Sequence, residues 1–214
     1  MKIKWLGHSS FLIKSKGKNI YIDPYAGEYI EKADLILVTH DHGDHCDLGK
    51  ISQIVQANTI IVTSLKAAEK ARSVGVEVIS LDPGETKNYK GFKVQGVEAY
   101  NTHRFRFPGT PFHPKGTQVG FIIEAEGKRL YHAGDTDLLP AMKELGSIDV
   151  AMIPVGGTYT MDVPEAAEAV LSIKPKMVLP MHRRDTKVEE LKKLVEKSDA
   201  KLVVLSEGEE LELP

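Results

Sequence analysis

Alternating hydrophobic and polar positions predict two β-hairpins that closely resemble each other. The first covers residues 11–24 and turns at Lys16-Gly17-Lys18, and the second covers residues 121–132 and turns near Gly127. When 110 is added to the residue numbers of the first hairpin, identical residues align at five positions, which are Phe11, Ile13, Gly17, Lys18 and Tyr21. A match this regular indicates that the chain contains two similar halves.

Apolar runs that follow each hairpin predict further strands in the same order. The runs at residues 34–38, 59–62 and 78–85 of the first half correspond to those at 149–153, 176–179 and 202–209 of the second. Apolar residues at three- and four-residue spacing predict helices over residues 48–56, 65–73, 137–145, 164–173 and 188–197. Each half is therefore predicted to contain a β-hairpin, a strand, a helix, a strand, a helix and a strand.

This repeated order of elements predicts an α/β fold with four layers. Each half can form a sheet that turns one apolar face toward the other half and is covered by helices on its opposite face. Stacking the two sheets gives an α/β/β/α sandwich, which we expect to form a single domain over residues 1–214. Loops from both halves meet at the seam between the sheets, so we expect the functional site there.

The composition is ordinary for a soluble globular protein and excludes several classes of function. Hydrophobic residues make up 42% of the 214 residues and charged residues 27%, and the formal net charge is −2. There is no global basic field for non-specific binding to nucleic acid or membranes. The amino terminus lacks the pattern of a signal peptide, and the single cysteine, Cys46, excludes an internal disulfide. We therefore expect a cytoplasmic protein that does not bind membranes.

Candidate metal ligands gather directly after the predicted strand at residues 34–38. His40 and His42 are two residues apart, so they project together from the strand end. Gly43 allows a sharp turn that can bring Asp44 and His45 back toward them. Imidazole and carboxylate groups are ligands that zinc, manganese and iron accept. The cluster therefore predicts a metal site, whereas the alternative is a polar loop with surface histidines.

Further residues of ligand type lie at strand ends or in loops of the predicted fold. Asp135 follows the second hairpin, His182 follows a strand of the second half, and His113 lies in a loop rich in proline and glycine. Asp23 lies at the end of the first hairpin and either orients a ligand histidine or forms an Asp-Pro turn. His8 is at a strand end and either faces the site or is a structural histidine.

The motifs together resemble those of the metallo-β-lactamase superfamily, in their usual order. The similarity rests on His40-x-His42-x-Asp44-His45, a loop histidine, Ala133-Gly134-Asp135-Thr136 and Pro180-Met181-His182. Segments at residues 6–8, 22–24 and 154–161 are further similar to small stand-alone prokaryotic metal-dependent hydrolases related to the L-ascorbate-6-phosphate lactonases. The resemblance covers nearly the whole chain and implies the metallo-β-lactamase fold.

The resemblance also implies a centre with two divalent metal ions. The expected ligands of one ion are His40, His42 and a loop histidine. The expected ligands of the second ion are Asp44, His45 and His182. Asp135 is expected to bridge the two ions. Zinc or manganese is the expected metal, and nickel or iron also suits nitrogen and oxygen ligands.

Two histidines compete for the role of loop ligand. In the commonest pattern of the superfamily this histidine directly follows a strand, where the present chain has Ala99-Tyr100-Asn101-Thr102-His103. We favour the later His113, because its Phe-His-Pro-Lys-Gly setting is similar to a branch of the family that uses such a position. The prolines on either side of Phe112-His113 also reduce the conformational entropy lost on binding. His103 remains the alternative.

The implied activity is hydrolysis by a hydroxide that two metal ions activate. Asp44 and Asp135 are the expected catalytic carboxylates, and His8 is a candidate for protonating the leaving group. The expected substrate is a phosphodiester or another small anionic phosphate compound, or a short oligonucleotide, because basic residues are near the predicted site. These residues are Arg104, Arg106, Lys115 and Arg183.

Two other functions are consistent with the same residues. The first is a lactonase that acts on a sugar lactone, including a phosphorylated one. The second belongs to another class and is a non-catalytic binding module that metal ions stabilise. Strand-end ligands without a closed set of cysteines favour a catalytic site over a structural one. A homo-oligomer is compatible with the sequence.

Overall fold

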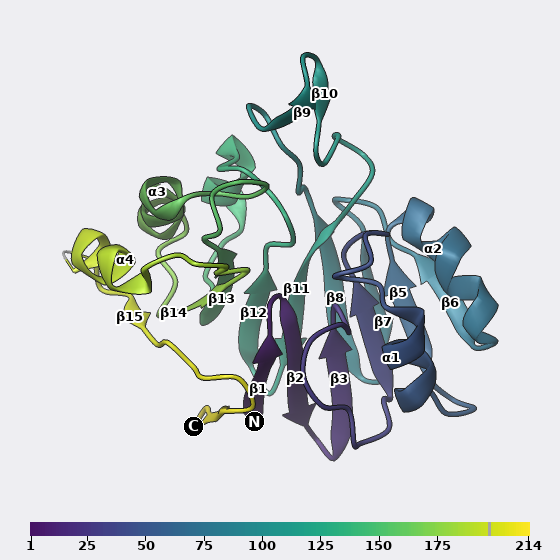
Figure 1. Ribbon diagram of the computed structural model, residues 1–214. Coiled ribbons are helices and arrows are strands. Elements are labelled where there is room, and N and C mark those ends of the chain that lie inside the picture. Colours follow the sequence, from purple (N-terminus) through teal and green to yellow (C-terminus); the bar gives the residue numbers. More distant parts are fainter. Residues whose placement is uncertain (197) are drawn as a thin grey trace.

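Two seven-stranded β-sheets form the centre of the molecule (Figure 1). The structure is a computed structural model and describes residues 1–196 and 198–214. The first sheet has the order β16 (Glu210–Glu212), β1 (Lys2–Gly7), β2 (Ser10–Ser15), β3 (Lys18–Ile22), β4 (Leu35–Val38), β5 (Ile60–Thr63), β6 (Glu77–Ser80). The second has the order β15 (Lys201–Leu202), β14 (Met177–Met181), β13 (Val150–Pro154), β12 (Lys128–His132), β11 (Gly120–Ala125), β8 (Phe92–Val97), β7 (Thr86–Tyr89).

The two hairpins of the repeat occupy equivalent places in the two sheets. β2 pairs antiparallel with β3, and β11 pairs antiparallel with β12, with the same strand lengths in both hairpins. Each hairpin turns through two residues with positive φ, Lys16-Gly17 and Glu126-Gly127, as a tight two-residue hairpin turn requires. Three parallel strands then follow each hairpin, from β4 to β6 and from β13 to β15. The prediction of two similar halves is confirmed.

Helices cover the outer faces of both sheets. α1 (Leu48–Ile54) and α2 (Leu65–Ala71) lie over the first sheet, and α3 (Val163–Ile173) and α4 (Val188–Val195) lie over the second (Figure 1). Side chains at the N-caps of α1, α2 and α3 accept hydrogen bonds from backbone N–H groups of the first turn. The layers are therefore α/β/β/α, as predicted. No helix among the described residues has the length and apolar character needed to cross a membrane.

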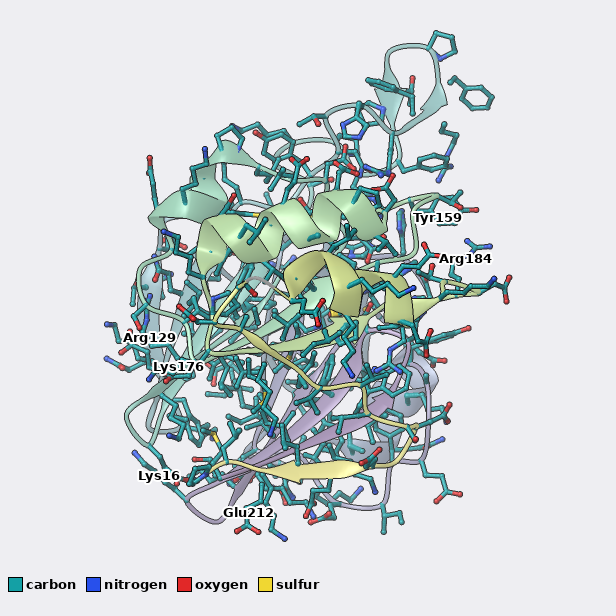
Figure 2. All side chains as sticks on the ribbon, turned by 90° about the vertical axis from the view of Figure 1, so that its left-hand side faces the viewer. Lys16, Arg129, Tyr159, Lys176, Arg184 and Glu212 are labelled. Atoms are coloured by element: carbon teal, nitrogen blue, oxygen red, sulfur yellow. The ribbon has the colours of Figure 1, made fainter. Side chains whose placement is uncertain are left out.

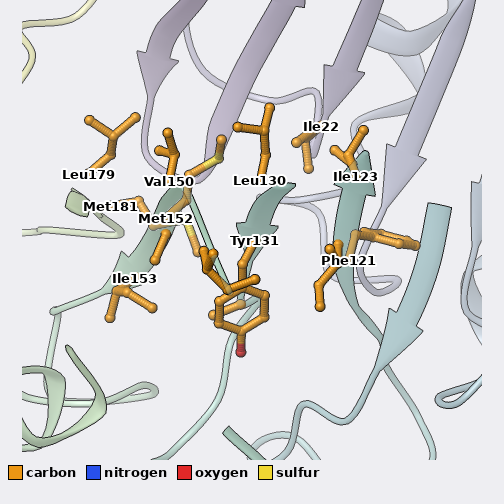
Figure 3. Packing of buried hydrophobic residues seen from close by; sticks show 14 of the residues in the cluster. Ile22, Phe121, Ile123, Leu130, Tyr131, Val150, Met152, Ile153, Leu179 and Met181 are labelled. Atoms are coloured by element: carbon orange, nitrogen blue, oxygen red, sulfur yellow. The ribbon is translucent and has the colours of Figure 1, made fainter. Parts of the chain in front are cut away.

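Alternation along the strands separates two apolar layers. Leu35 and Leu37 of β4 belong to the cluster between the sheets, whereas Ile36 and Val38 belong to the cluster beneath α1 and α2. The cluster between the sheets joins residues of both halves, including Ile22 of β3 (Figure 3), and it continues into buried residues of α3 and α4. All four residues of β4 are fully buried, so this strand is a rigid base for the loop that follows it.

The structure differs from the predicted elements at residues 137–145 and toward the carboxyl end. The helix predicted over residues 137–145 is wrong, because only a short 3-10 helix forms at Pro140–Glu144. Asp137 binds backbone N–H groups of another loop and Leu139 is extended, which keeps both residues out of a helix. The other difference is at the carboxyl end, where β16 crosses to the first sheet and pairs with β1. The helix predicted over residues 188–197 ends at Val195, and Lys197 lies outside the described residues.

Candidate metal centre

The loop after β4 holds its side chains in a tight turn. The N–H groups of His45 and Cys46 both donate to the carbonyl of His42, at 3.0 and 2.8 Å. This turn places the rings of His40 and His45 4.1 Å apart, between ring centres. The carboxyl ends of β4, β12 and β14 lie at the same edge of the sandwich, and this edge carries the candidate ligands of both halves.

Three imidazole nitrogens converge at the first candidate metal position. His42 Nδ1 lies 3.0 Å from His40 Nε2 and 3.2 Å from His113 Nε2. Burial holds the pKa of His40 well below its ordinary value and lowers the pKa of His113 to about 4, so both rings are neutral at pH 7. Two neutral rings that face each other through unprotonated nitrogens cannot form a hydrogen bond. One cation placed between the three nitrogens can accept a lone pair from each of them. The residues therefore fit a divalent metal ion.

A second group of ligand atoms lies beside the first. His45 Nε2 is 3.3 Å from Asp135 Oδ1, and His182 Nε2 is 3.2 Å from Asp135 Oδ2. Asp44 Oδ2 lies 4.0 Å from His45 Nε2. Within residues 1–196 and 198–214, four buried side-chain atoms of these residues have no hydrogen-bond partner, namely His45 Nε2, Asp135 Oδ1 and both ring nitrogens of His182. A second cation would satisfy the three that face one another, which are His45 Nε2, Asp135 Oδ1 and His182 Nε2.

Asp135 lies between the two groups. Its carboxylate is 2% exposed, and its Oδ2 is also 3.5 Å from His113 Nε2 of the first group. Although burial opposes ionisation, His182 and His45 hold the pKa of Asp135 well below its usual range. Burial likewise opposes a charge on His45, yet Asp135 and Asp23 raise its pKa well above the ordinary value. The negative potential that attracts a proton in this way also attracts a metal cation.

Asp23 supports His45 from the side opposite Asp135. Its Oδ2 lies 2.7 Å from His45 Nδ1, and its carboxylate accepts hydrogen bonds from the N–H and hydroxyl of Thr39. Asp23 and His45 are both fully buried. The expected contact between Asp23 and a candidate ligand histidine is therefore present in the structure, and Asp23 also lies at a bend of the chain. Such a carboxylate fixes the orientation of the ring and raises its basicity.

We expect Asp23→Asn to weaken metal binding about 10- to 100-fold, because an outer hydrogen-bond partner of a ligand typically has an effect of this size. The amide keeps the shape of the side chain but loses the charge that faces His45. Titration of metal-free protein with Zn²⁺ against a competing chelator measures the change. Asp34→Asn is a matched control, since Asp34 accepts a hydrogen bond from Asn19 and pairs with Lys18 at a distance from the centre. Equal Zn²⁺ affinities for both variants would contradict the assigned role.

His8 and His182 meet across the seam between the two halves. Their ring centres are 4.1 Å apart, and the N–H of His182 donates to the carbonyl of His8 at 3.0 Å. His8 Nε2 lies 3.2 Å from Asp44 Oδ2. Both histidines have φ of 49°, a left-handed conformation that non-glycine residues adopt at a cost and that is concentrated at functional sites. A Cβ atom at Gly156 would lie 2.5 Å from the carbonyl oxygen of His182, so only glycine permits this close approach.

The structure separates the two histidines that competed for the role of loop ligand. His113 is 3% exposed and its Nε2 faces His42 and Asp135, as described above. The side chain of His103 is 56% exposed and pairs with Asp137 and Glu165 instead. The structure thus brings together the seven candidate ligands His40, His42, Asp44, His45, His113, Asp135 and His182, and leaves His103 outside.

Three of the four basic residues expected near a substrate have other contacts. The Arg104 guanidinium pairs with Asp137 and Glu165, and its Nε donates to the carbonyl of Gly157. Arg183 stacks on the ring of Trp5, 3.9 Å from its centre, and donates to the carbonyls of Pro180 and Leu205. Lys115 pairs with Glu98. These contacts engage all three side chains with the protein itself, and their expected role toward a substrate stays a prediction.

The fourth basic residue, Arg106, lines the cavity above the candidate ligands. The cavity has a volume of about 490 Å³, and Arg106 reaches it from β9 (Phe105–Phe107), which forms a projecting hairpin with β10 (Thr110–Pro111) (Figure 1). Phe112 and Tyr159 also line it, together with candidate ligands at its base. Sequence reasoning missed both aromatic residues, although Tyr159 lies in a glycine-containing segment directly after β13, where loops carry function. Arg184 stacks on Tyr159, 5.1 Å from the ring centre (Figure 2).

The sandwich of two sheets with a histidine and aspartate cluster at their common edge defines a protein of the β-lactamase superfamily. The family model described as "Beta-lactamase superfamily domain" matches residues 2–182. Two UPF0173 metal-dependent hydrolases are similar over the full length of both chains, with 39% identity for that of Pyrococcus abyssi and 38% for that of Nanoarchaeum equitans. The chain belongs to this UPF0173 family of metal-dependent hydrolases.

Solved structures agree with this assignment. A protein of Parabacteroides distasonis superposes with a TM-score of 0.88 at 34% identity, covering 94% of this chain and 91% of the other. Igni18, a metallo hydrolase from Ignicoccus hospitalis, superposes with a TM-score of 0.81 at 29% identity, covering 100% and 99%. The metallo-β-lactamase fold expected from the sequence is therefore shown.

Proposed function

We propose that this protein hydrolyses a phosphodiester or another anionic phosphate compound at a centre of two divalent metal ions. His40, His42 and His113 would hold one ion, Asp44, His45 and His182 the other, and Asp135 both. The observation that carries the proposal is the convergence of the ring nitrogens of His40, His42 and His113 beside the unpaired atoms of the second group. Two bound cations would supply a water of lowered pKa and stabilise charge that develops on the substrate.

The chain itself supplies orientation and a route for a proton. Asp135 is held between both groups of ligands, so it can accept a hydrogen bond from a nucleophilic water. His8 Nε2 is hydrogen-bonded to Asp44 Oδ2, and we assign His8 the delivery of a proton to the leaving group. The open cavity above these residues favours this reaction over a purely structural metal site, since structural sites are closed by protein ligands.

Arg106 supports an anionic substrate. It is exposed, it lines the same cavity as His42, Asp44 and His113, and its guanidinium lies 5.8 Å from the centre of the Phe112 ring. A guanidinium in this place can bind phosphate oxygens through two parallel N–H groups while its stem rests on the ring. A phosphate compound therefore fits the cavity better than a neutral lactone does.

We expect Arg106→Gln to raise KM for a phosphodiester about 10-fold and to change kcat little, because the interaction binds substrate and transition state alike. Steady-state kinetics with bis-p-nitrophenyl phosphate provide the measurement. Arg72→Gln is the matched control, since Arg72 is exposed at the end of α2 and loses the same charge. An unchanged KM in Arg106→Gln would remove Arg106 from the substrate site.

The proposed function is tested by returning metals to metal-free protein. Mn²⁺, Zn²⁺ and Ni²⁺ are added separately, and hydrolysis of bis-p-nitrophenyl phosphate is compared with hydrolysis of a panel of lactones. Metal-dependent cleavage of the phosphodiester is the expected result. Cleavage of lactones alone would replace the phosphodiesterase by a lactonase, and inactivity with every metal would contradict both.

A further inference from the structure

A hydrogen-bond network outside the candidate ligands leads directly to His113. It starts at Asn101, which is 4% exposed and lies twelve positions before His113 in the chain. Asn101 Oδ1 accepts hydrogen bonds from both the backbone N–H and the ring Nδ1 of His113, each at 2.9 Å. In return, the backbone N–H of Asn101 donates to the carbonyl of His113 at 2.8 Å. Asn101 thus holds the backbone and the ring of His113 together.

The orientation of the Asn101 amide is fixed by two acceptors on its other side. Its Nδ2 donates to Asp137 Oδ1 at 2.9 Å and to the carbonyl of Tyr159 at 3.0 Å. A flipped amide would direct its NH₂ group at the backbone N–H of His113 and its oxygen at the Asp137 carboxylate, so both contacts would become repulsive. With the amide in this orientation, His113 must carry its proton on Nδ1. Its Nε2 lone pair then faces His42 and Asp135.

Asp137 is in turn held by a second layer of donors. Its side chain is fully buried, and Oδ2 accepts hydrogen bonds from the backbone N–H groups of Thr102 and His103 at 2.7 and 3.1 Å. Arg104 Nη1 donates to Oδ1 at 2.6 Å. The same guanidinium binds Glu165 in α3 and the carbonyl of Gly157. The loop that starts at Asn101 is thereby attached to the helix and loop beside the cavity.

We propose that Asn101, oriented by Asp137, is the positioning residue that presents His113 to the metal centre as an Nε2 ligand. This inference rests on the proposed function, which identifies the metal centre. It also assigns Arg104 to holding Asp137 and Glu165 in place instead of binding the substrate. Asp137, Glu165 and His103 also bring one potential ligand atom each close together, as residues of a cation site do. Arg104 already supplies the positive charge between them, so their role is to hold the loop.

The tautomer of His113 gives a direct test that needs no activity. Metal-free protein labelled with ¹⁵N-histidine is studied by long-range ¹H–¹⁵N NMR at mildly alkaline pH, and the His113 signals are identified by their loss in His113→Gln. We expect the wild-type ring to be protonated on Nδ1 and unprotonated on Nε2. A proton on Nε2 in the wild type would overturn the proposal whether or not any variant folds.

Two variants then show whether Asn101 positions His113 or only stabilises the fold. In Asn101→Ala we expect a mixture of His113 tautomers and one Zn²⁺ site weakened about 10- to 100-fold, with the other site unchanged. Glu165→Gln is the control, because it weakens the outer end of the network without touching His113. It should lower thermal stability while keeping the wild-type tautomer and both Zn²⁺ affinities. Equal Zn²⁺ affinities in Asn101→Ala and the control would contradict positioning.

The two proposals fail in different ways. If His113 has the expected tautomer but wild-type protein binds no Zn²⁺ or cleaves no phosphodiester with any metal, the proposed function is wrong and the role of Asn101 in holding His113 stands. If wild-type protein is active with the opposite tautomer, the role of Asn101 is wrong and the proposed function stands.

Discussion

Asp135→Ala is expected to lower turnover by about 10³-fold or more, because the variant loses the carboxylate that both metal ions would share. In the wild type this carboxylate faces His45, His113 and His182 within 3.5 Å. Removing it also removes negative potential from the buried place where the proposed cations would bind. Metal content after dialysis should therefore fall from the two ions per chain of the proposed centre to one or none.

The measurement combines kcat for bis-p-nitrophenyl phosphate, metal analysis and circular dichroism. We expect the circular dichroism spectrum to remain that of the wild type, because Asp135 is in a loop after β12 and not in the apolar layer. Asp149→Asn serves as the control, since Asp149 pairs with Lys176 where β13 and β14 begin, and His182 follows the other end of β14. Asp135→Ala with more than about a tenth of wild-type turnover would refute the shared ligand.

The variants His113→Ala and His103→Ala test which of these two histidines is the loop ligand. Loss of a direct ligand should exceed the 10- to 100-fold effect typical of an outer partner, so we expect His113→Ala to lose on the order of 10²-fold or more in kcat/KM. The His103 side chain is 56% exposed and pairs with Asp137 and Glu165 instead of facing the candidate ligands, so its loss should change kcat/KM by about a factor of two at most. Metal analysis should find at least one ion missing only in His113→Ala.

Assays of both variants with Mn²⁺ and with Zn²⁺ guard against a change of metal preference. The opposite pattern, with activity lost in His103→Ala and retained in His113→Ala, would show that the loop rearranges when metals bind. It would also exclude Asn101 as the residue that presents a ligand. Equal loss in both variants would indicate that the loop as a whole, and not one imidazole, determines activity.

Much of the fold could be predicted because its signals are local. The hairpins at residues 11–24 and 121–132 have alternation of period two and a glycine in each turn, and both properties act within a few residues. The helix predicted over residues 137–145 does not form, although its apolar residues have the spacing of a helix just as those of the helices that do form. Its first residue, Asp137, instead binds N–H groups of Thr102 and His103, which are more than thirty positions away in the chain. Spacing along the chain carries no information about such a partner.

The sequence by itself determined the two halves, the four layers and the compact group His40, His42, Asp44 and His45, because these ligands follow one strand within six residues. Only the tertiary structure placed His113, and not His103, beside the other candidate ligands, since this placement depends on Asn101 and Asp137 meeting across two loops. It also decided that Arg106 faces the cavity while Arg104 is paired within the protein. The charge of a side chain determines which groups it can pair with. The packing of elements that are distant in the sequence determines which of these groups lies close enough to form the pair.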